Sequence, residues 1–187
     1  ERSATYFPGD APTALTNIVS ITRNPRNQGF IEYVGHDTYI NWRKETESAG
    51  DFAISIGSTT IDHINYLADP YGEQIEFLTY YYYEPRSRQN VNFNYKYEQH
   101  NVSVNMTRMG HMNIYGTAGG GTKSDPHIMT NVSYSYDWSP DIDTYVSIRN
   151  IDDVMPQKDT GYSYPFFNQG YYSAFGRYMT AGITYRF

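Results

Sequence analysis

Hydrophobic and polar residues alternate one by one along much of this chain. In segment 177–187, one face of an extended strand would carry Met179, Ala181, Ile183, Tyr185 and Phe187, and the other Thr180, Gly182, Thr184 and Arg186. Side chains of a strand point alternately to opposite faces, so this segment is predicted to be a strand with one apolar and one polar face. The same pattern predicts strands at 30–44, 51–66, 90–97, 101–109, 127–138 and 141–151, and a weaker one at 18–22. Within 51–66 it places Ile64 and Tyr66 on the same face as Ile54 and Ile56.

The predicted connections alternate between short turns and long loops. The turns are 45–50, 98–100 and 139–140, and the loops, rich in Tyr, Gly and Pro, are 67–88, 110–126 and 152–176. Transmembrane barrels have this arrangement, with short turns at one rim and long loops at the other. A strand of ~11 residues tilted by ~45° spans roughly 25 Å, the height of the lipid-facing band of such a barrel. Two predicted strands are longer and are expected to project beyond the bilayer.

Aromatic residues decide between two interpretations of the alternation. A soluble sandwich, which buries one face of each sheet, would also alternate. However, the short-turn ends of the predicted strands gather the aromatic residues Trp42, Tyr97, Tyr136, Trp138, Tyr185 and Phe187. Aromatic belts form where a membrane meets water. The predicted fold class is therefore all-β, an antiparallel transmembrane β-barrel.

Composition narrows the function classes. The 187 residues suit one domain, and 21 of them are tyrosines. No apolar run is long enough for a transmembrane helix. The absence of cysteine excludes disulfides and thiolate chemistry, and a net charge of -6 without a basic patch argues against nucleic acid as a partner. Because Glu1 does not open a signal peptide, we expect a processed chain or a piece of a longer one.

Four short motifs occur in order along the chain. They are Gly35-His-Asp37 opening a long predicted strand, Glu84-Pro-Arg-Ser-Arg88 before a strand pair, Asn150-Ile-Asp-Asp153 followed by Pro156, and the closing Gly176-Arg-Tyr178 with Tyr185-Arg-Phe187. With them, the region from Arg2 to Phe187 resembles the C-terminal part of a TonB-dependent outer-membrane receptor. His36 and Ile151 are small departures from the usual residues of these motifs.

The resemblance implies the function and the partners. It implies that residues 1–187 form about the last eight strands of a barrel of about 22 strands, in the outer membrane of a Gram-negative bacterium. Such receptors take up a bulky nutrient such as a siderophore, cobalamin, haem or an oligosaccharide, energised by TonB through a plug domain that this chain lacks. Expected partners are outer-membrane lipid, the remaining strands, the plug and the barrel-assembly machinery, which would read Tyr185 and Phe187. The alternative is a self-contained eight-stranded barrel acting as an adhesin or structural anchor.

Aromatic residues of two predicted outer loops are the candidate ligand contacts. They are Tyr80, Tyr81, Tyr82, Tyr83, Tyr162, Tyr164, Phe166 and Phe167. Aromatic faces stack on sugar rings and planar chelators, and tyrosine adds a hydroxyl group. Alternatively, these residues pack the loops together or form an upper aromatic belt, which is the favoured interpretation for Tyr171 and Tyr172.

Other polar residues do not indicate catalysis. His111 and His127 flank the Gly-rich segment 116–121, but their spacing matches no metal or haem pattern. Acidic residues occur at Asp141, Asp143, Asp152 and Asp153, without a nucleophile or base at recognisable spacing. We therefore expect no enzyme activity, no metal and no cofactor. The glycosylation-like asparagines Asn101, Asn105 and Asn131 are predicted to face the barrel interior. Arg177 is expected to pair with Asp152 or Asp153.

Overall fold

A computed structural model describes residues 29–67, 72–80, 84–114 and 122–187. Its elements are β1 (Phe30–Lys44), β2 (Asp51–Leu67), β3 (Ile75–Glu76), α1 (Phe77–Tyr80), β4 (Ser87–Tyr97), β5 (His100–Met109), β6 (His127–Ser139), β7 (Ile142–Arg149) and β8 (Tyr178–Tyr185). Among the described residues, no helix has the length and apolar character needed to cross a membrane.

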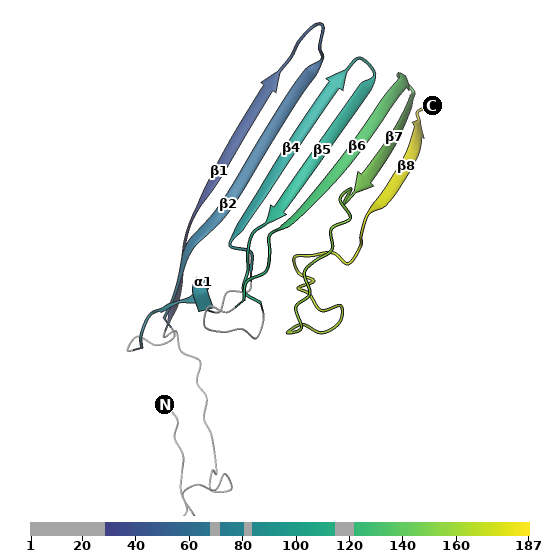
Figure 1. Cartoon of the computed structure of the whole chain (residues 1–187). Helices are drawn as coiled ribbons and strands as arrows, with labels where there is room; N and C mark the ends of the chain where they lie inside the picture. The colour runs from purple at the N-terminus through teal and green to yellow at the C-terminus, as the bar shows by residue number, and fades with distance from the viewer. Residues whose placement is uncertain (1–28, 68–71, 81–83, 115–121) are drawn as a thin grey trace, which may run out of the picture.

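The strands form one antiparallel sheet in the order β1-β2-β4-β5-β6-β7-β8, with the short β3 added to β2 (Figure 1). Apart from β3, each strand pairs with the next strand along the chain. In the described part of the chain β1 pairs only with β2, and β8 only with β7, so the sheet is open and not closed into a barrel. The all-β antiparallel prediction is confirmed, while barrel closure stays a prediction.

The seven main predicted strands are present, and their ends differ from the predicted bounds by at most a few residues. The largest difference is at β4, which begins at Ser87 and not at 90. The predicted strand 18–22 lies outside the described residues, and β3 is too short for its two residues to show a periodicity. Figure 1 shows the short turns and the C-terminus at one end of the sheet and the long connections at the other.

The sheet has two chemically different faces, because the register of neighbouring strands pairs apolar positions with apolar positions and polar positions with polar ones. On one face a row of directly paired residues crosses the whole sheet: Trp42, Ile54, Phe93, Val104, Val132, Ile148 and Met179. One residue further along, the opposite face carries the paired row Asn41, Ser55, Asn92, Asn105 and Asn131. The predicted apolar and polar faces are thus continuous across strands that are far apart in sequence.

Asparagines on the polar face bond to one another across three strands, and we call Asn90, Asn92, Asn105, Asn131 and Asn150 the asparagine row. The side-chain amide of Asn92 donates to Asn90 Oδ1 (2.6 Å), that of Asn105 to Asn92 Oδ1 (2.7 Å), and that of Asn131 to Asn105 Oδ1 (3.2 Å). The backbone N–H of Asn150 completes the row on Asn131 Oδ1 (3.0 Å). Asn105 and Asn131 thus occupy the polar face, as predicted.

A register shift changes the faces of β1 and β2 near the long-loop end. Gly35 pairs with Ile61 but Val34 pairs with His63, so Asp62 is an extra residue in β2. Beyond it Ile64 lies opposite Tyr33, whereas Ile56 lies opposite Ile40. The prediction that Ile64 and Tyr66 share a face with Ile54 and Ile56 is therefore wrong, because one inserted residue reverses a period of two.

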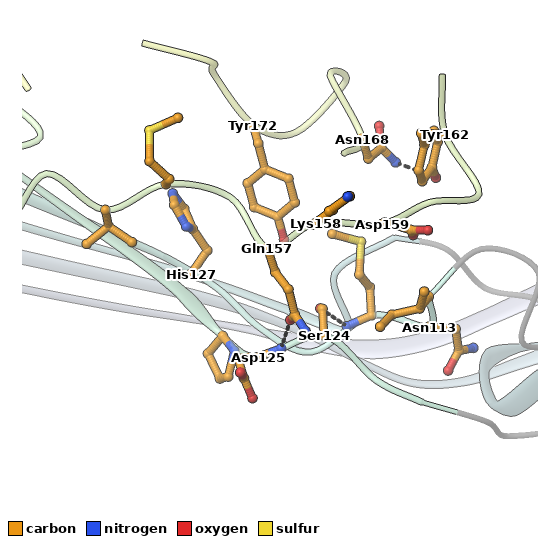
Figure 2. A pocket seen from close by; sticks show the side chains of 15 residues that line it. Asn113, Ser124, Asp125, His127, Gln157, Lys158, Asp159, Tyr162, Asn168 and Tyr172 are labelled. Atoms are coloured by element: carbon orange, nitrogen blue, oxygen red, sulfur yellow. Dashed lines mark hydrogen bonds between the residues drawn. The ribbon is translucent and has the colours of Figure 1, made fainter. Parts of the chain in front are cut away.

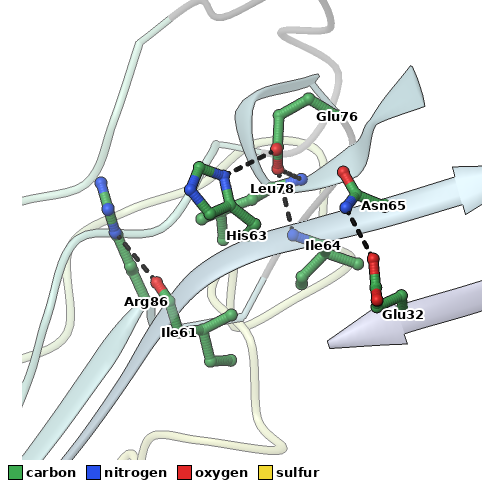
Figure 3. Close-up of polar contacts among 8 residues, drawn as sticks. All are labelled: Glu32, Ile61, His63, Ile64, Asn65, Glu76, Leu78 and Arg86. Carbon is green, nitrogen blue, oxygen red and sulfur yellow. Dashed lines mark hydrogen bonds and ion pairs between the residues drawn. The ribbon is translucent and has the colours of Figure 1, made fainter. Parts of the chain in front are cut away.

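Glu76 attaches β3 and the start of α1 to β2 (Figure 3). Its carboxylate accepts hydrogen bonds from the backbone N–H groups of Ile64 (3.1 Å) and Leu78 (3.3 Å) and lies 3.1 Å from His63 Nδ1. Burial raises the pKa of Glu76, but the hydrogen bonds from Ile64, His63 and Leu78 outweigh it, so that the pKa is lowered overall. This carboxylate therefore holds the loop most firmly when it is ionised.

Among the described residues, no protein core covers either face of the sheet. In the described part of the chain the buried hydrophobic side chains are Ile64, Met112 and Phe167, all from the long-loop end. On the apolar face of β8, Met179 is 69% exposed and Ile183 71% exposed. No second layer of described residues covers these side chains, as a soluble sandwich would require.

Candidate functional site

A cavity of about 210 Å³ lies at the long-loop end of the sheet, between the segment that precedes β6 and the loop that joins β7 to β8. We call it the loop pocket (Figure 2). Its polar and aromatic lining includes Asn113, Ser124, Gln157, Tyr162, Asn168 and Tyr172. Two connections that are separated in sequence by a whole hairpin therefore build one concave site.

The first wall is held in shape by a short backbone ladder around Ser124. The N–H of Ser124 donates to the carbonyl of Met112 (2.9 Å), and the N–H of Met112 donates to the Ser124 hydroxyl (3.2 Å). His111 donates from Nδ1 to the carbonyl oxygen of Ser124 (2.7 Å). These bonds fold the segment back on itself and hold Asn113 at the pocket.

The second wall begins at Asn150, which is buried and has a left-handed backbone with φ of 51°. Its side-chain amide donates to the carbonyl of Val154 (2.9 Å), and its Oδ1 accepts from the N–H of the same residue (2.9 Å). Asparagine tolerates this conformation because its short polar side chain bonds locally. The chain is thereby turned from β7 into the pocket wall.

The two walls are joined directly by a hydrogen bond. The backbone N–H of Asp125, in the first wall, donates to Gln157 Oε1 in the second (2.7 Å). The aromatic side is formed by Tyr172, whose ring meets that of His127 edge-on at 5.0 Å between centroids. Further along, the amide of Asn168 donates to the hydroxyl of Tyr162 (3.0 Å). Amides, hydroxyls and tyrosine rings therefore line the pocket together with apolar side chains, which are Met112, Ile114, Pro126, Val154 and Met155.

The charges around the pocket are few and of mixed sign. Asp125, Lys158 and Asp159 line it, and Lys158 Nζ lies 5.2 Å from the centroid of the Phe166 ring. Burial raises the pKa of the Tyr172 hydroxyl, which keeps it protonated and able to donate a hydrogen bond. The arrangement can therefore offer neutral donors and acceptors next to an aromatic surface.

The structure distributes the predicted ligand residues over several environments. Tyr162 lines the loop pocket. Tyr164 is 83% exposed and meets Phe166 edge-on at 6.0 Å, outside the pocket lining. Phe167 is buried, with 6% of its surface exposed, and packs the loop. The side chain of Tyr80 and the whole of residues Tyr81, Tyr82 and Tyr83 lie outside the part that is described.

The Tyr171–Tyr172 pair divides between packing and pocket. The guanidinium of Arg88 lies 4.9 Å from the centroid of the Tyr171 ring, and Arg88 pairs with Glu84 at 3.7 Å. Burial, followed by a hydrogen bond with Glu84, raises the pKa of Tyr171 to about 12. Tyr171 thus fastens the last long loop to the start of β4, as the packing interpretation predicts, while Tyr172 lines the pocket.

Arg177 and Asp153 meet, although not through the expected ion pair. The backbone N–H of Arg177 donates to Asp153 Oδ1 (2.7 Å), and its guanidinium donates to the carbonyl of Ile151 (3.3 Å). The predicted partner Asp153 is therefore correct, but the predicted ion pair is wrong. The loop brings the backbone amide of Arg177, and not its guanidinium, to the Asp153 carboxylate. In the described part of the chain, no three His, Asp or Glu residues cluster to hold a metal ion.

The predicted assembly signal lies at the other end of the sheet. Tyr185 ends β8, and its ring lies 6.2 Å from that of Phe187. Both aromatic rings are exposed. The structure places them at the short-turn end, and their role as an assembly signal stays a prediction.

The loop pocket contains residues that the sequence did not single out. Gln157 and Asn168 have no periodic or motif signal, since they come together only through the path of the loop. The asparagine row, in contrast, has a signal: Asn90, Asn92 and Asn94 recur at every second position of one strand.

Comparisons with protein-family models, curated proteins and solved structures find no match to this chain. The described part of the chain is an open antiparallel sheet with one apolar face, one polar face and long loops at one end.

Proposed function

We propose that this chain is part of the wall of a TonB-dependent outer-membrane receptor, which takes up a bulky nutrient such as a siderophore or an oligosaccharide. The observation that carries the proposal is the uncovered apolar face. Large hydrophobic side chains from β1 to β8 stay exposed on it, and no described residues cover them. An apolar surface of this extent is stable in contact with lipid and promotes aggregation in water.

The polar face and the open edges support the same proposal. Side chains of the asparagine row bond to one another, as expected of a wall that faces a water-filled interior. Unpaired edge strands in lipid would leave backbone groups without partners, each at a cost of several kcal/mol. We therefore propose that further strands of the same receptor pair with β1 and β8, which favours the receptor over a self-contained eight-stranded barrel.

The proposal assigns the two ends of the sheet to the two sides of the membrane. The short turns and the aromatic residues Trp138, Tyr185 and Phe187 would lie at the periplasmic interface, and Phe187 would be read by the barrel-assembly machinery. The long loops, with the loop pocket, would face the outside and capture the nutrient. Transport would be driven by TonB through a plug, and the proposal includes no catalytic step.

Fractionation of cells that express the whole protein tests this proposal. We expect the protein in the outer membrane, resistant to carbonate extraction, and folded in detergent so that its electrophoretic mobility changes on heating. Deletion of Phe187 is expected to reduce the folded, membrane-inserted fraction, whereas the substitution Asp152→Ala at an exposed loop position leaves it unchanged. A deletion strain and a strain without TonB should lose growth on the same nutrient. Recovery of the protein in a soluble fraction as a folded monomer would refute the proposal.

A further inference from the structure

The loop pocket combines three features that together indicate the chemistry of its ligand. It is concave, it is built by two loops joined through the Asp125–Gln157 hydrogen bond, and it presents uncharged polar and aromatic side chains beside apolar ones, which are Met112, Ile114, Pro126, Val154 and Met155. Binding sites are commonly concave clefts in which a few placed polar groups fix the orientation of the ligand. These features describe a binding site more closely than a packing defect between loops.

Tyr172 supplies the aromatic surface of the site. Its ring is fixed from one side by the edge-on contact with His127, and its phenol extends toward Gln157 (Figure 2). The Tyr172 hydroxyl has no hydrogen-bond partner among the described residues. A half-buried tyrosine with an available hydroxyl can stack on a ring of a ligand and donate a hydrogen bond to it at the same time.

Amide groups surround this ring. Gln157 uses Oε1 for the Asp125 N–H, which fixes the side chain in one orientation and leaves its NH₂ group as a donor. Asn168 is fixed in the same way, because its Oδ1 accepts from the N–H of Gly170 (3.0 Å) and its amide donates to Tyr162 (3.0 Å). Donors and acceptors held in place bind a polyhydroxylated molecule with little loss of side-chain entropy.

The charges of the pocket lining argue against an anionic chelate as the ligand. Among the described lining residues, two acids, Asp125 and Asp159, stand with one lysine, Lys158, and one histidine, His127, and the chain as a whole carries a net charge of -6. Anionic ligands are usually held by clusters of arginine or lysine, which make charge-assisted hydrogen bonds. None of the described residues that line the loop pocket is an arginine. An anionic ligand would therefore meet a neutral to negative surface.

We propose that the loop pocket binds one ring of a neutral carbohydrate, so that the nutrient captured by this receptor is a neutral oligosaccharide and not an anionic metal chelate. This inference rests on the proposed uptake function, which it makes specific. The uncharged asparagine row on the polar face agrees with it, since side-chain amides can both donate hydrogen bonds to the hydroxyl groups of a sugar and accept them. The ring stacks on Tyr172, and the amides of Gln157 and the hydroxyl of Tyr172 bond its hydroxyl groups.

Binding to the whole protein in detergent tests the inference by isothermal titration calorimetry. The probes are neutral hexasaccharides of glucose, mannose, xylose and fructose, with ferric citrate as an anionic chelate. We expect at least one hexasaccharide to bind and ferric citrate not to bind. Binding of ferric citrate alone, or of no hexasaccharide, would overturn the inference.

Matched tyrosine variants locate the site. Tyr172→Ala is expected to weaken binding by at least about tenfold, since the loss of about 1.4 kcal/mol from one contact is a tenfold change. Tyr172→Phe keeps the ring and should lose less, which separates the ring from the hydroxyl and guards against a misfolded alanine variant. Tyr164→Ala, in the same loop but outside the lining, should bind as the native protein does. Equal affinities of the native protein and Tyr172→Ala, or a loss only in Tyr164→Ala, would refute the assignment.

The outcomes distinguish the two proposals. If the protein is inserted in the outer membrane and supports TonB-dependent growth, but Tyr172→Ala binds the hexasaccharide normally, only the carbohydrate assignment fails. If the protein is soluble but binds a hexasaccharide through Tyr172, the receptor proposal fails and the chemistry of the pocket stands.

Discussion

Replacement of Asn150 by alanine should detach the last long loop from the sheet. Asn150 is 2% exposed, and its side chain makes two hydrogen bonds of 2.9 Å with the N–H and C=O of Val154. Alanine removes both and leaves two backbone groups of Val154 without their partners. The loop of the second pocket wall begins here, so the same change is expected to loosen the loop pocket.

The size of the effect follows from the geometry. A buried donor or acceptor left without a partner costs about 1–3 kcal/mol. Val154 is partly exposed, so water can reach its two backbone groups and the cost per group lies at the lower end of this range. The two groups together are therefore expected to cost about 2 kcal/mol. The left-handed backbone of residue 150, with φ of 51°, adds a second contribution to the loss of stability. Alanine there costs about 1 kcal/mol, because its Cβ crowds the carbonyl oxygen, while asparagine offsets the strain with local hydrogen bonds. The expected total for Asn150→Ala is about 3 kcal/mol.

Hydrogen exchange of the Val154 amide in the whole protein measures this loss. About 3 kcal/mol corresponds to a fall in protection of roughly a hundredfold. Asp152→Ala is the matched control, since Asp152 lies in the same turn and is exposed. Its effect on the Val154 amide is expected to be within about twofold, as for most surface substitutions. If Asn150→Ala and Asp152→Ala give the same exchange rate, the role assigned to the Asn150 side chain is wrong.

Three further perturbations test the sheet and its attachment to the loops. Gly35→Ala is expected to destabilise the β1–β2 pair by about 1–3 kcal/mol in denaturant unfolding, because the new Cβ would collide with the carbonyl oxygen of Thr60. Asn105→Ala removes two hydrogen bonds of the asparagine row and should cost about 1–2 kcal/mol in the same assay, since water on the polar face replaces part of them. Acid should release β3 from β2, because the pKa of Glu76 is lowered from 4.5 in the folded protein. The stabilisation by the ionised carboxylate is complete above pH 4.5 and is lost as the pH falls through the lower pKa of the folded protein. Hydrogen exchange of the Ile64 amide would detect this loss.

Each of these predictions has a control in the same part of the molecule. Gly57→Ala places its Cβ at an ordinary 3.4 Å from the Tyr39 ring, so an effect as large as that of Gly35→Ala would contradict the collision argument. Thr180→Ala lies on the polar face outside the asparagine row and should be nearly neutral; a loss equal to that of Asn105→Ala would show that the row adds nothing. Glu76→Gln should remove the pH step, and its persistence would assign the step to another group.

The strands could be predicted from the sequence because their signal is local. Alternation along a strand reflects only which neighbours point to the same face, so Val102, Val104 and Met106 identify their face without knowledge of their partners. Turn lengths are local in the same sense. The loop residues were harder to assign: Tyr162 does line a pocket, but Phe167 packs inside the loop, and composition cannot separate a tyrosine or phenylalanine that contacts ligand from one that contacts protein.

The amino-acid sequence by itself determined an antiparallel all-β chain with an apolar face, a polar face, short turns at one end and long loops at the other. The tertiary structure decided what depends on distant partners: the extra residue Asp62 that reverses the faces of β2, the bonding of Asn105 to Asn131, and the loop pocket that joins Asp125 to Gln157. The physical reason is the range of the interactions. A period of two is set by the backbone of each strand, whereas a register shift or a contact between loops is set by the segment that happens to lie opposite.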